Sequence, residues 1–284
     1  MDELKPSRTA LRVAVRRAAH QLLERPLVFA DPLAIPILGP QGKTWIEAEM
    51  GRADHPASRT LRAFLAARSR YAEDELAQAV LAGVRQYVIL GAGLDTFCCR
   101  NPHATVGLRV FEVDHPSTQH WKRALLEEAH VAPADGVQFV SVDFERQTLP
   151  EQLRDAGFDS GQPAFCACLG VVPYLTEDAF TAAMEFVASL PDQSGIVFDY
   201  AVARQSLNLL ERLALDALSK RVAAAGEPFR LFFEPESLAR RLRLLGFTRI
   251  EDLGRDELNS RYFAGRSDGF QVRGGLGRLA GVWR

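Results

Sequence analysis

A glycine-rich loop follows a short apolar run in the first third of the chain. Residues 87–90 read Tyr-Val-Ile-Leu and lead directly into Gly91 and, one residue further on, Gly93. Two glycines let a backbone turn tightly after a strand and approach a bound ligand closely. A dinucleotide fingerprint has a third glycine where Thr96 stands, and a phosphate P-loop ends in Gly-Lys-Ser/Thr. The loop therefore predicts a nucleotide-type cofactor without specifying which one.

An acid ends the next predicted strand. Asp114 comes 23 residues after Gly91, close to the offset of about 20 residues at which a carboxylate accepts hydrogen bonds from ribose hydroxyls. Glu112 faces the same side of that strand and is a second candidate. The sequence His115-Pro116 suits a helix start, so Asp114 could instead cap that helix.

Asp143 and Phe144 end the third predicted strand in the same manner. An aspartate there can accept from an exocyclic adenine amino group, while Phe144 supplies an apolar wall or its backbone N–H. A plain loop aspartate fits the spacing equally well. In the helix before the Gly loop, the guanidinium of Arg68 or Arg70 could clamp a carboxylate bidentately, although helical arginines are commonly solvated.

The elements that position these residues alternate along the chain. Strand-like runs at 87–90, 108–113, 137–142, 164–169 and 195–200 are separated by helical patterns such as 116–130 and 177–190. Alternation of this kind predicts an α/β fold with a doubly wound, mostly parallel sheet, in which ligands bind beyond the carboxyl ends of the strands. The helix 235–245 and the strands 247–250 and 279–283 close the chain and add an antiparallel last strand.

Helical segments flank this core. Helices are expected over 7–25, from Asp31-Pro32 onward and over 58–82, and a long helical stretch at 206–225 interrupts the alternation. We therefore expect one domain over 1–284. Its parts are an N-terminal helical cap (1–84), a cofactor-binding core (85–200), a helical lid insertion (201–233) and the C-terminal part of the core (234–284).

Composition describes an ordinary globular chain of 284 residues, 47% hydrophobic and 25% charged, with a formal net charge of -2. A net charge this close to zero does not favour binding to nucleic acid or to an anionic membrane. We interpret the arginines at 8, 12, 16 and 17 as a solvated helix face. The four cysteines complete neither a disulfide framework nor a metal site. Without an apolar signal or membrane segment, we expect a cytoplasmic protein.

Five ordered motifs carry a family resemblance that spans nearly the whole chain. The sequence resembles the leucine carboxyl methyltransferase-like family of S-adenosylmethionine-dependent methyltransferases, and within it the bacterial polyketide-type O-methyltransferase branch. The motifs are Phe-Ala-Asp-Pro-Leu-Ala at 29–34, Arg-Ser-Arg-Tyr at 68–71, Leu-Gly-Ala-Gly-Leu-Asp-Thr at 90–96, Phe-Glu-Val-Asp-His-Pro at 111–116 and Gly-Val-Val-Pro-Tyr-Leu at 170–175.

The resemblance implies a class I (Rossmann-like) methyltransferase fold and S-adenosylmethionine as the cofactor. It implies that the methionine part lies by Gly91 and Gly93 with its carboxylate on Arg68, that Asp114 holds the ribose, and that Asp143 and Phe144 hold the adenine. A cofactor without a pyrophosphate also explains the missing third glycine. One departure stands out: the family usually has an acid before Gly-Val at the end of the fourth strand, and this chain has Leu169.

The expected function is methyl transfer by in-line displacement to a carboxylate or hydroxyl oxygen of a small metabolite. A carboxylate needs no base, whereas a hydroxyl does, and Tyr174 and His115 are the catalytic candidates, with His120 a third. Two alternatives stay open. The Gly loop with Asp114 also fits a nicotinamide-dependent oxidoreductase, and Leu169 fits a non-catalytic S-adenosylmethionine-binding protein. We expect a small-molecule acceptor as the partner, and no pattern specifies an oligomeric state.

Overall fold

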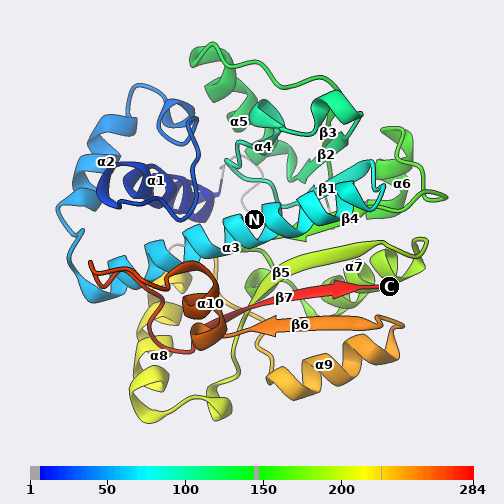
Figure 1. Ribbon diagram of the computed structural model, residues 1–284. Coiled ribbons are helices and arrows are strands. Elements are labelled where there is room, and N and C mark those ends of the chain that lie inside the picture. Colours follow the sequence, from blue (N-terminus) through cyan, green and yellow to red (C-terminus); the bar gives the residue numbers. More distant parts are fainter. Residues whose placement is uncertain (1–6, 144–146, 225) are drawn as a thin grey trace.

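A computed structural model describes residues 7–143, 147–224 and 226–284 of the chain. Within these residues, seven strands form one sheet in the order β3-β2-β1-β4-β5-β7-β6 (Figure 1). The strands are β1 Gln86–Leu90, β2 Arg109–Asp114, β3 Val137–Ser141, β4 Phe165–Cys168, β5 Gly195–Ala201, β6 Arg249–Leu253 and β7 Gly277–Trp283.

The helices precede, separate and follow these strands. The α-helices are α1 Arg8–Leu23, α2 Gly42–Met50, α3 Pro56–Leu81, α4 Phe97–Arg100, α5 Pro116–Glu128, α6 Leu149–Asp155, α7 Glu177–Ser189, α8 Leu209–Ala223, α9 Pro235–Leu244 and α10 Arg255–Tyr262. Short 3-10 turns lie at η1 Pro36–Leu38, η2 Ala104–Val106, η3 Val172–Tyr174 and η4 Arg204–Ser206.

Strand direction follows the sequence-based expectation. Strands β1 to β5 pair in parallel, and β7 pairs antiparallel with both β5 and β6. The predicted mostly parallel sheet with an antiparallel last strand is confirmed, and β7 lies inside the sheet while β6 forms its edge. The carboxyl ends of β1 to β5 therefore meet at one edge of the sheet, where ligands of this architecture bind.

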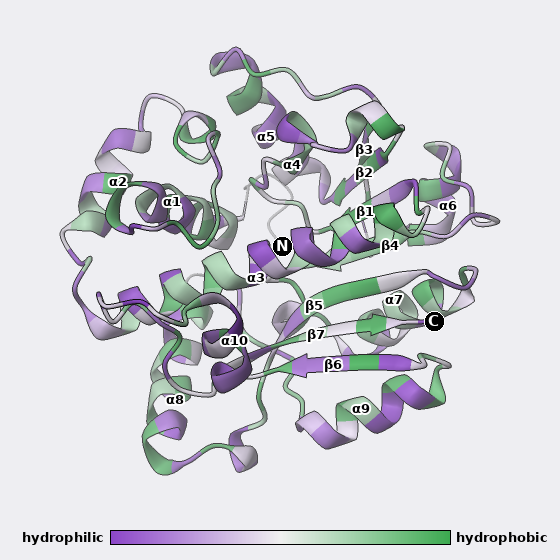
Figure 2. Cartoon of the chain, in the orientation of Figure 1, coloured by the Kyte–Doolittle hydropathy of each residue, from purple (hydrophilic) through white to green (hydrophobic). Residues whose placement is uncertain are grey.

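Alternation along the strands divides the core between the two faces of the sheet. Val88 and Leu90 of β1 belong to a cluster with residues of α7 and α9, whereas Tyr87 and Ile89 pack with residues of α3. Helix α3, cyan in Figure 1, crosses one face of the sheet. Figure 2 shows β5 as a mainly hydrophobic strand and α10 as a hydrophilic helix. Burial on both faces explains why the parallel strands read as continuous apolar runs.

Two sequence-based expectations about the N-terminal region are wrong. No helix begins at Pro32: the Asp31 carboxylate accepts from Leu33 N at 3.1 Å and holds a turn, and the short η1 turn follows. The arginine face of α1 is not solvated throughout, because Arg17 forms ion pairs with Asp31 at 3.3 Å and Asp95 at 2.8 Å. The position of the Arg17 side chain is set by two acids distant in sequence, the buried Asp31 and the partly buried Asp95, which helical periodicity cannot predict.

In the part of the chain that the structure describes, none of the helices combines the length and apolarity that crossing a bilayer requires.

Candidate functional site

The Gly loop leaves β1 at the carboxyl edge of the sheet. Gly91 has a φ of +68° and Gly93 a φ of +51°, both in the left-handed region that favours glycine. The N–H groups of Gly91 and Ala92 donate to the Val113 carbonyl at 2.8 and 3.2 Å, which ties the loop to β2. A Cβ atom on Gly91 would lie 2.3 Å from Cγ2 of Val171. The loop is therefore a close approach of two strand ends that a side chain would disrupt.

Asp114 at the end of β2 faces this loop. Its Oδ2 accepts from the Gly93 N–H at 2.5 Å, and its Oδ1 accepts from the His115 N–H at 2.7 Å. Burial raises the pKa of Asp114, and the two backbone hydrogen bonds partly offset that rise. The structure thus brings together Asp114 and Gly93, two of the predicted site residues. It does not pair the Asp114 side chain with the first turn of α5, because the side chain of His115 caps that helix.

Arg68 reaches the neighbouring strand ends from the middle of α3. Its Nη1 donates to Oδ2 of Asp199 at 2.9 Å, and Oδ1 of Asp199 accepts from the Gly170 N–H at 2.5 Å. Both charged side chains are buried. Arg70, the alternative clamp, points elsewhere: it is about half exposed and pairs with Asp74 at 2.7 Å. Of the two arginines, only Arg68 lies at the edge where the Gly loop ends.

The remaining acids at the strand ends differ in their surroundings. Val142 donates to the Asp114 carbonyl at 2.9 Å, so Asp143 follows directly beside the end of β2. Phe144 lies outside the described residues. Glu112 is not at the site: its carboxylate is buried and accepts from Lys122 Nζ at 2.5 Å. Burial raises the pKa of Glu112, and Lys122 opposes that rise. Glu112 therefore serves as a core ion pair between β2 and α5.

An ion-pair network that local sequence patterns do not predict fastens the N-terminal region to the Gly loop. Both oxygens of Asp31 accept from the Thr96 hydroxyl at 2.8 Å, and Arg17 bridges Asp31 and Asp95. Burial works against the charge of Asp95, yet the nearby Arg17 and Arg100 guanidinium groups lower its pKa. Thr96 thus occupies the third-glycine position as a buried anchor. The motifs at 29–34 and 90–96 could have indicated this contact, because the first contains Asp31 and the second contains Thr96.

The two catalytic candidates lie on different elements. His115 caps α5, with Nδ1 placed 3.3 Å from the Ser117 N–H and 2.8 Å from the Ser117 hydroxyl. Tyr174 closes η3 and packs against Phe229, with ring centroids 5.3 Å apart. Burial raises the pKa of Tyr174, and a hydrogen bond with Thr9 partly offsets the rise. The structure therefore does not bring the two candidates into a common hydrogen-bonded unit.

Three segments far apart in sequence meet around Tyr174. Thr9, in the first turn of α1, donates from its N–H to Glu227 at 3.0 Å and hydrogen-bonds the same carboxylate through its hydroxyl. The N–H groups of Arg230 and Leu231 donate to the Pro173 carbonyl at 2.7 and 3.2 Å. The start of α1 and the segment after α8 thus lie against η3, next to the Gly loop.

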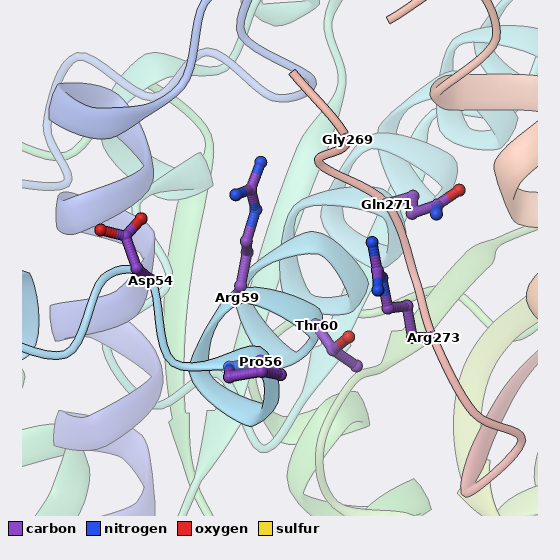
Figure 3. A pocket seen from close by; sticks show the side chains of 7 residues that line it. All are labelled: Asp54, Pro56, Arg59, Thr60, Gly269, Gln271 and Arg273. Atoms are coloured by element: carbon purple, nitrogen blue, oxygen red, sulfur yellow. The ribbon is translucent and has the colours of Figure 1, made fainter. Parts of the chain in front are cut away.

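A separate pocket of about 210 Å³ opens between the start of α3 and a C-terminal segment (Figure 3). Its lining residues are Asp54, Pro56, Arg59, Thr60, Gly269, Gln271 and Arg273. None of these is a predicted site residue. Thr60, the lining residue on α3 nearest to Arg68, precedes it by eight residues, which at a helical rise of 1.5 Å per residue separates them by about 12 Å. The pocket is therefore distinct from the strand-end site.

The fold and this site define a class of protein. A DUF574 family protein of Streptomyces avermitilis superposes with a TM-score of 0.61 at 17% identity, covering 96% of this chain and 97% of that one. A crystal structure described as a methyltransferase from Thermobifida fusca gives a TM-score of 0.58 at 16% identity, covering 99% and 95%. The chain has the class I S-adenosylmethionine-dependent methyltransferase fold.

Sequence comparison identifies the family. Residues 10–188 match the sequence profile of leucine carboxyl methyltransferase. YktD of Bacillus subtilis, named as an S-adenosyl-L-methionine-dependent methyltransferase, is 33% identical over 94% of this chain and 95% of its own length. A relative of the same description from Mycobacterium marinum is 32% identical over 87% of this chain and 80% of its own. The chain belongs to the leucine carboxyl methyltransferase family, and its cofactor is S-adenosylmethionine.

The strand-end residues fit this cofactor. The Gly loop has no room for a side chain at Gly91, Asp114 faces the loop with lone pairs still available on both oxygens, and Arg68 presents a guanidinium to the same edge. These features suit a ribose and an amino-acid carboxylate, and they do not require the pyrophosphate of a nicotinamide dinucleotide. Within the described ranges, no group of three His, Cys, Asp or Glu side chains could hold a metal ion.

Proposed function

We propose that this methyltransferase acts on an oxygen of a small acceptor, with a carboxylate as the nucleophile. One observation favours a carboxylate over a hydroxyl: none of the candidate bases is suited to remove a proton, and the third of them, His120, lies exposed on α5. His115 is engaged as the cap of α5, and burial raises the pKa of Tyr174. A hydroxyl acceptor needs a base, whereas a carboxylic acid with a pKa of about 4 is already ionised at neutral pH.

In this proposal, the strand-end residues orient the cofactor. Asp114 accepts from the ribose hydroxyls, Arg68 binds the methionyl carboxylate, and Gly91 and Gly93 admit the methionyl chain beside the loop. Asp143 accepts from the adenine amino group, with Phe144 beside it. Bound S-adenosylmethionine supplies an electrophilic methyl group for in-line displacement.

The acceptor pocket, in the same proposal, lies where α1, η3 and the lid meet. Tyr174 stays protonated and donates a hydrogen bond that positions the acceptor carboxylate. Phe229 supplies an apolar wall that excludes water, which suits an acceptor with an apolar body. The N-terminal cap (1–84) and the lid insertion (201–233) close over the acceptor together, because the contact of Thr9 with Glu227 joins them.

The Tyr174 assignment makes a pH prediction. The raised pKa keeps the phenol protonated from about pH 6 to 9, since the ordinary tyrosine value is already about 10. The methylation rate is therefore expected to stay level across that range, and Tyr174→Phe is expected to lower it by about tenfold or less without changing the profile. A rate that rises with pH in the parent and no longer rises in Tyr174→Phe would identify a base and contradict the proposal.

The nature of the methylated oxygen can be tested chemically. The enzyme is incubated with methyl-tritiated S-adenosylmethionine and matched pairs of small aromatic carboxylic acids and alcohols, such as benzoate and benzyl alcohol. Label in a methyl ester is released as volatile methanol at alkaline pH, whereas label in a methyl ether is not. We expect alkali-labile label from carboxylic acids. Alkali-stable label from alcohols alone would contradict a carboxylate acceptor, and turnover of any kind excludes a non-catalytic binding protein.

A further inference from the structure

The ion pair of Arg68 and Asp199 is a buried charge pair at the carboxyl edge of the sheet. The side chains are 8% and 9% exposed, and Arg68 Nη1 lies 2.9 Å from Asp199 Oδ2. Taking two charges out of water costs several kcal/mol per ion, and their attraction offsets this cost only with good geometry and further hydrogen bonds. Stability alone therefore does not explain a buried ion pair at the carboxyl edge of the sheet, where ligands of this fold bind.

The pair has unused hydrogen-bonding capacity. Among the described residues, Arg68 donates only through Nη1, so Nε and Nη2 retain their hydrogens for another acceptor. Asp199 accepts from Arg68 and from the Gly170 N–H, which leaves lone pairs on both of its oxygens. The free N–H groups of the Arg68 guanidinium and the free lone pairs of the Asp199 carboxylate thus lie side by side.

Gly170 lets the guanidinium lie against the end of β4. It has a φ of +73°, and a Cβ atom there would lie 2.9 Å from Nη2 and 3.0 Å from Nη1 of Arg68. The next residue, Val171, contacts the Gly loop at Gly91. Arg68 and Asp199 are therefore held next to the loop by the backbone, rather than by the side chain of Leu169, which packs against the core.

We propose that Asp199 binds the ammonium group of the methionyl moiety while Arg68 binds its carboxylate. This inference rests on the cofactor placement in the proposed function and extends it to a residue of β5. The amino-acid end of the cofactor carries one carboxylate and one ammonium group. The carboxylate complements the free N–H groups of Arg68, and the ammonium complements the free lone pairs of Asp199. The resemblance places the family's acid before Gly170 near the methionyl ammonium or the substrate, so Asp199 would take over the ammonium contact from β5, and Leu169 does not imply loss of cofactor recognition.

The test compares three ligands by isothermal titration calorimetry: S-adenosylhomocysteine, its des-amino analogue that keeps the carboxylate, and 5′-methylthioadenosine, which lacks the amino-acid end. The parent protein is expected to bind S-adenosylhomocysteine at least about tenfold more tightly than the des-amino analogue, because the des-amino analogue lacks the ammonium group and with it the charge-assisted hydrogen bond to Asp199. Equal affinities would overturn the proposal without any substitution. Failure of the parent to bind S-adenosylhomocysteine would instead reject the proposed function.

Asp199→Asn sharpens the comparison, since the amide retains an acceptor for Gly170. It is expected to weaken S-adenosylhomocysteine binding about 10- to 30-fold and to change binding of the des-amino analogue less than about threefold. Asp252→Asn is the matched control: Asp252 pairs with Arg278 at 2.9 Å on the same sheet, at β6. If Asp199→Asn weakens both ligands equally, the pair only holds Arg68 in place and the ammonium assignment is wrong.

Discussion

Asp114→Ala is expected to weaken binding of S-adenosylhomocysteine by more than about 100-fold. Asp114 faces the Gly loop through its hydrogen bond with the Gly93 N–H, and in our proposal it accepts from the ribose hydroxyls. Loss of two hydrogen bonds to a charged group, each worth about 1.5–3 kcal/mol, exceeds the 2.7 kcal/mol that corresponds to 100-fold. 5′-Methylthioadenosine contains the same ribose, so its affinity should fall in parallel, unlike in Asp199→Asn.

Two controls separate this effect from damage to the fold. Asp114→Asn keeps one acceptor oxygen for the backbone N–H groups of Gly93 and His115, and it should lose binding while its unfolding temperature stays close to that of the parent. Asp256→Ala removes an acid of α10 that is 77% exposed, and it should leave binding unchanged. Unaltered affinity in a folded Asp114→Ala protein would refute the ribose assignment.

Gly91→Ala is expected to destabilise the protein by about 2–5 kcal/mol and to reduce cofactor binding. The backbone at φ +68° costs an L-residue roughly 1–2 kcal/mol, and overpacking against Val171 adds roughly 1–3 kcal/mol. Thermal unfolding should register a lower midpoint by about 5 °C or more. Calorimetry with S-adenosylhomocysteine measures the accompanying loss of affinity.

A double variant identifies the cause of the lower unfolding midpoint of Gly91→Ala. Val171→Ala removes Cγ2, the atom 2.3 Å from the added Cβ, so Gly91→Ala with Val171→Ala should recover the overpacking part and retain the backbone part. A midpoint as low as that of Gly91→Ala alone would mean that the contact with Val171 is not responsible.

Local patterns predicted the core of the fold because the sheet is buried on both faces. Continuous apolar runs at 87–90 and 195–200 correspond to β1 and β5, and the alternation of strands with helices matches the parallel pairing. The Gly loop and Asp114 were predicted to lie at the carboxyl edge of the sheet from residue type and position, since strand ends and glycine turns have strong local signals, whereas Arg68 was preferred over Arg70 only through the family resemblance. Asp31 was expected to cap a helix and instead holds a turn and the Thr96 hydroxyl.

The unpredicted features depend on contacts between residues distant in sequence. Arg68 and Asp199 are 131 positions apart, and Thr9 and Glu227 are 218 apart. No local feature distinguishes Arg68 from an ordinary helical arginine, Asp199 from an ordinary strand acid, or Glu227 from an ordinary loop acid. The importance of Asp199 follows only from the tertiary neighbourhood of Gly170. The absence of an acid at Leu169 was visible in the sequence, but the residue that could replace it was not.

A crystal structure of the protein with bound S-adenosylhomocysteine tests the proposed cofactor placement most directly. We expect the ribose hydroxyls within hydrogen-bond distance of Asp114, the amino-acid carboxylate on Arg68, and the ammonium group on Asp199, with the sulfur directed toward Tyr174. A ligand that lies at the carboxyl edge of the sheet with its ribose away from Asp114, or that binds elsewhere on the molecule, would contradict this placement.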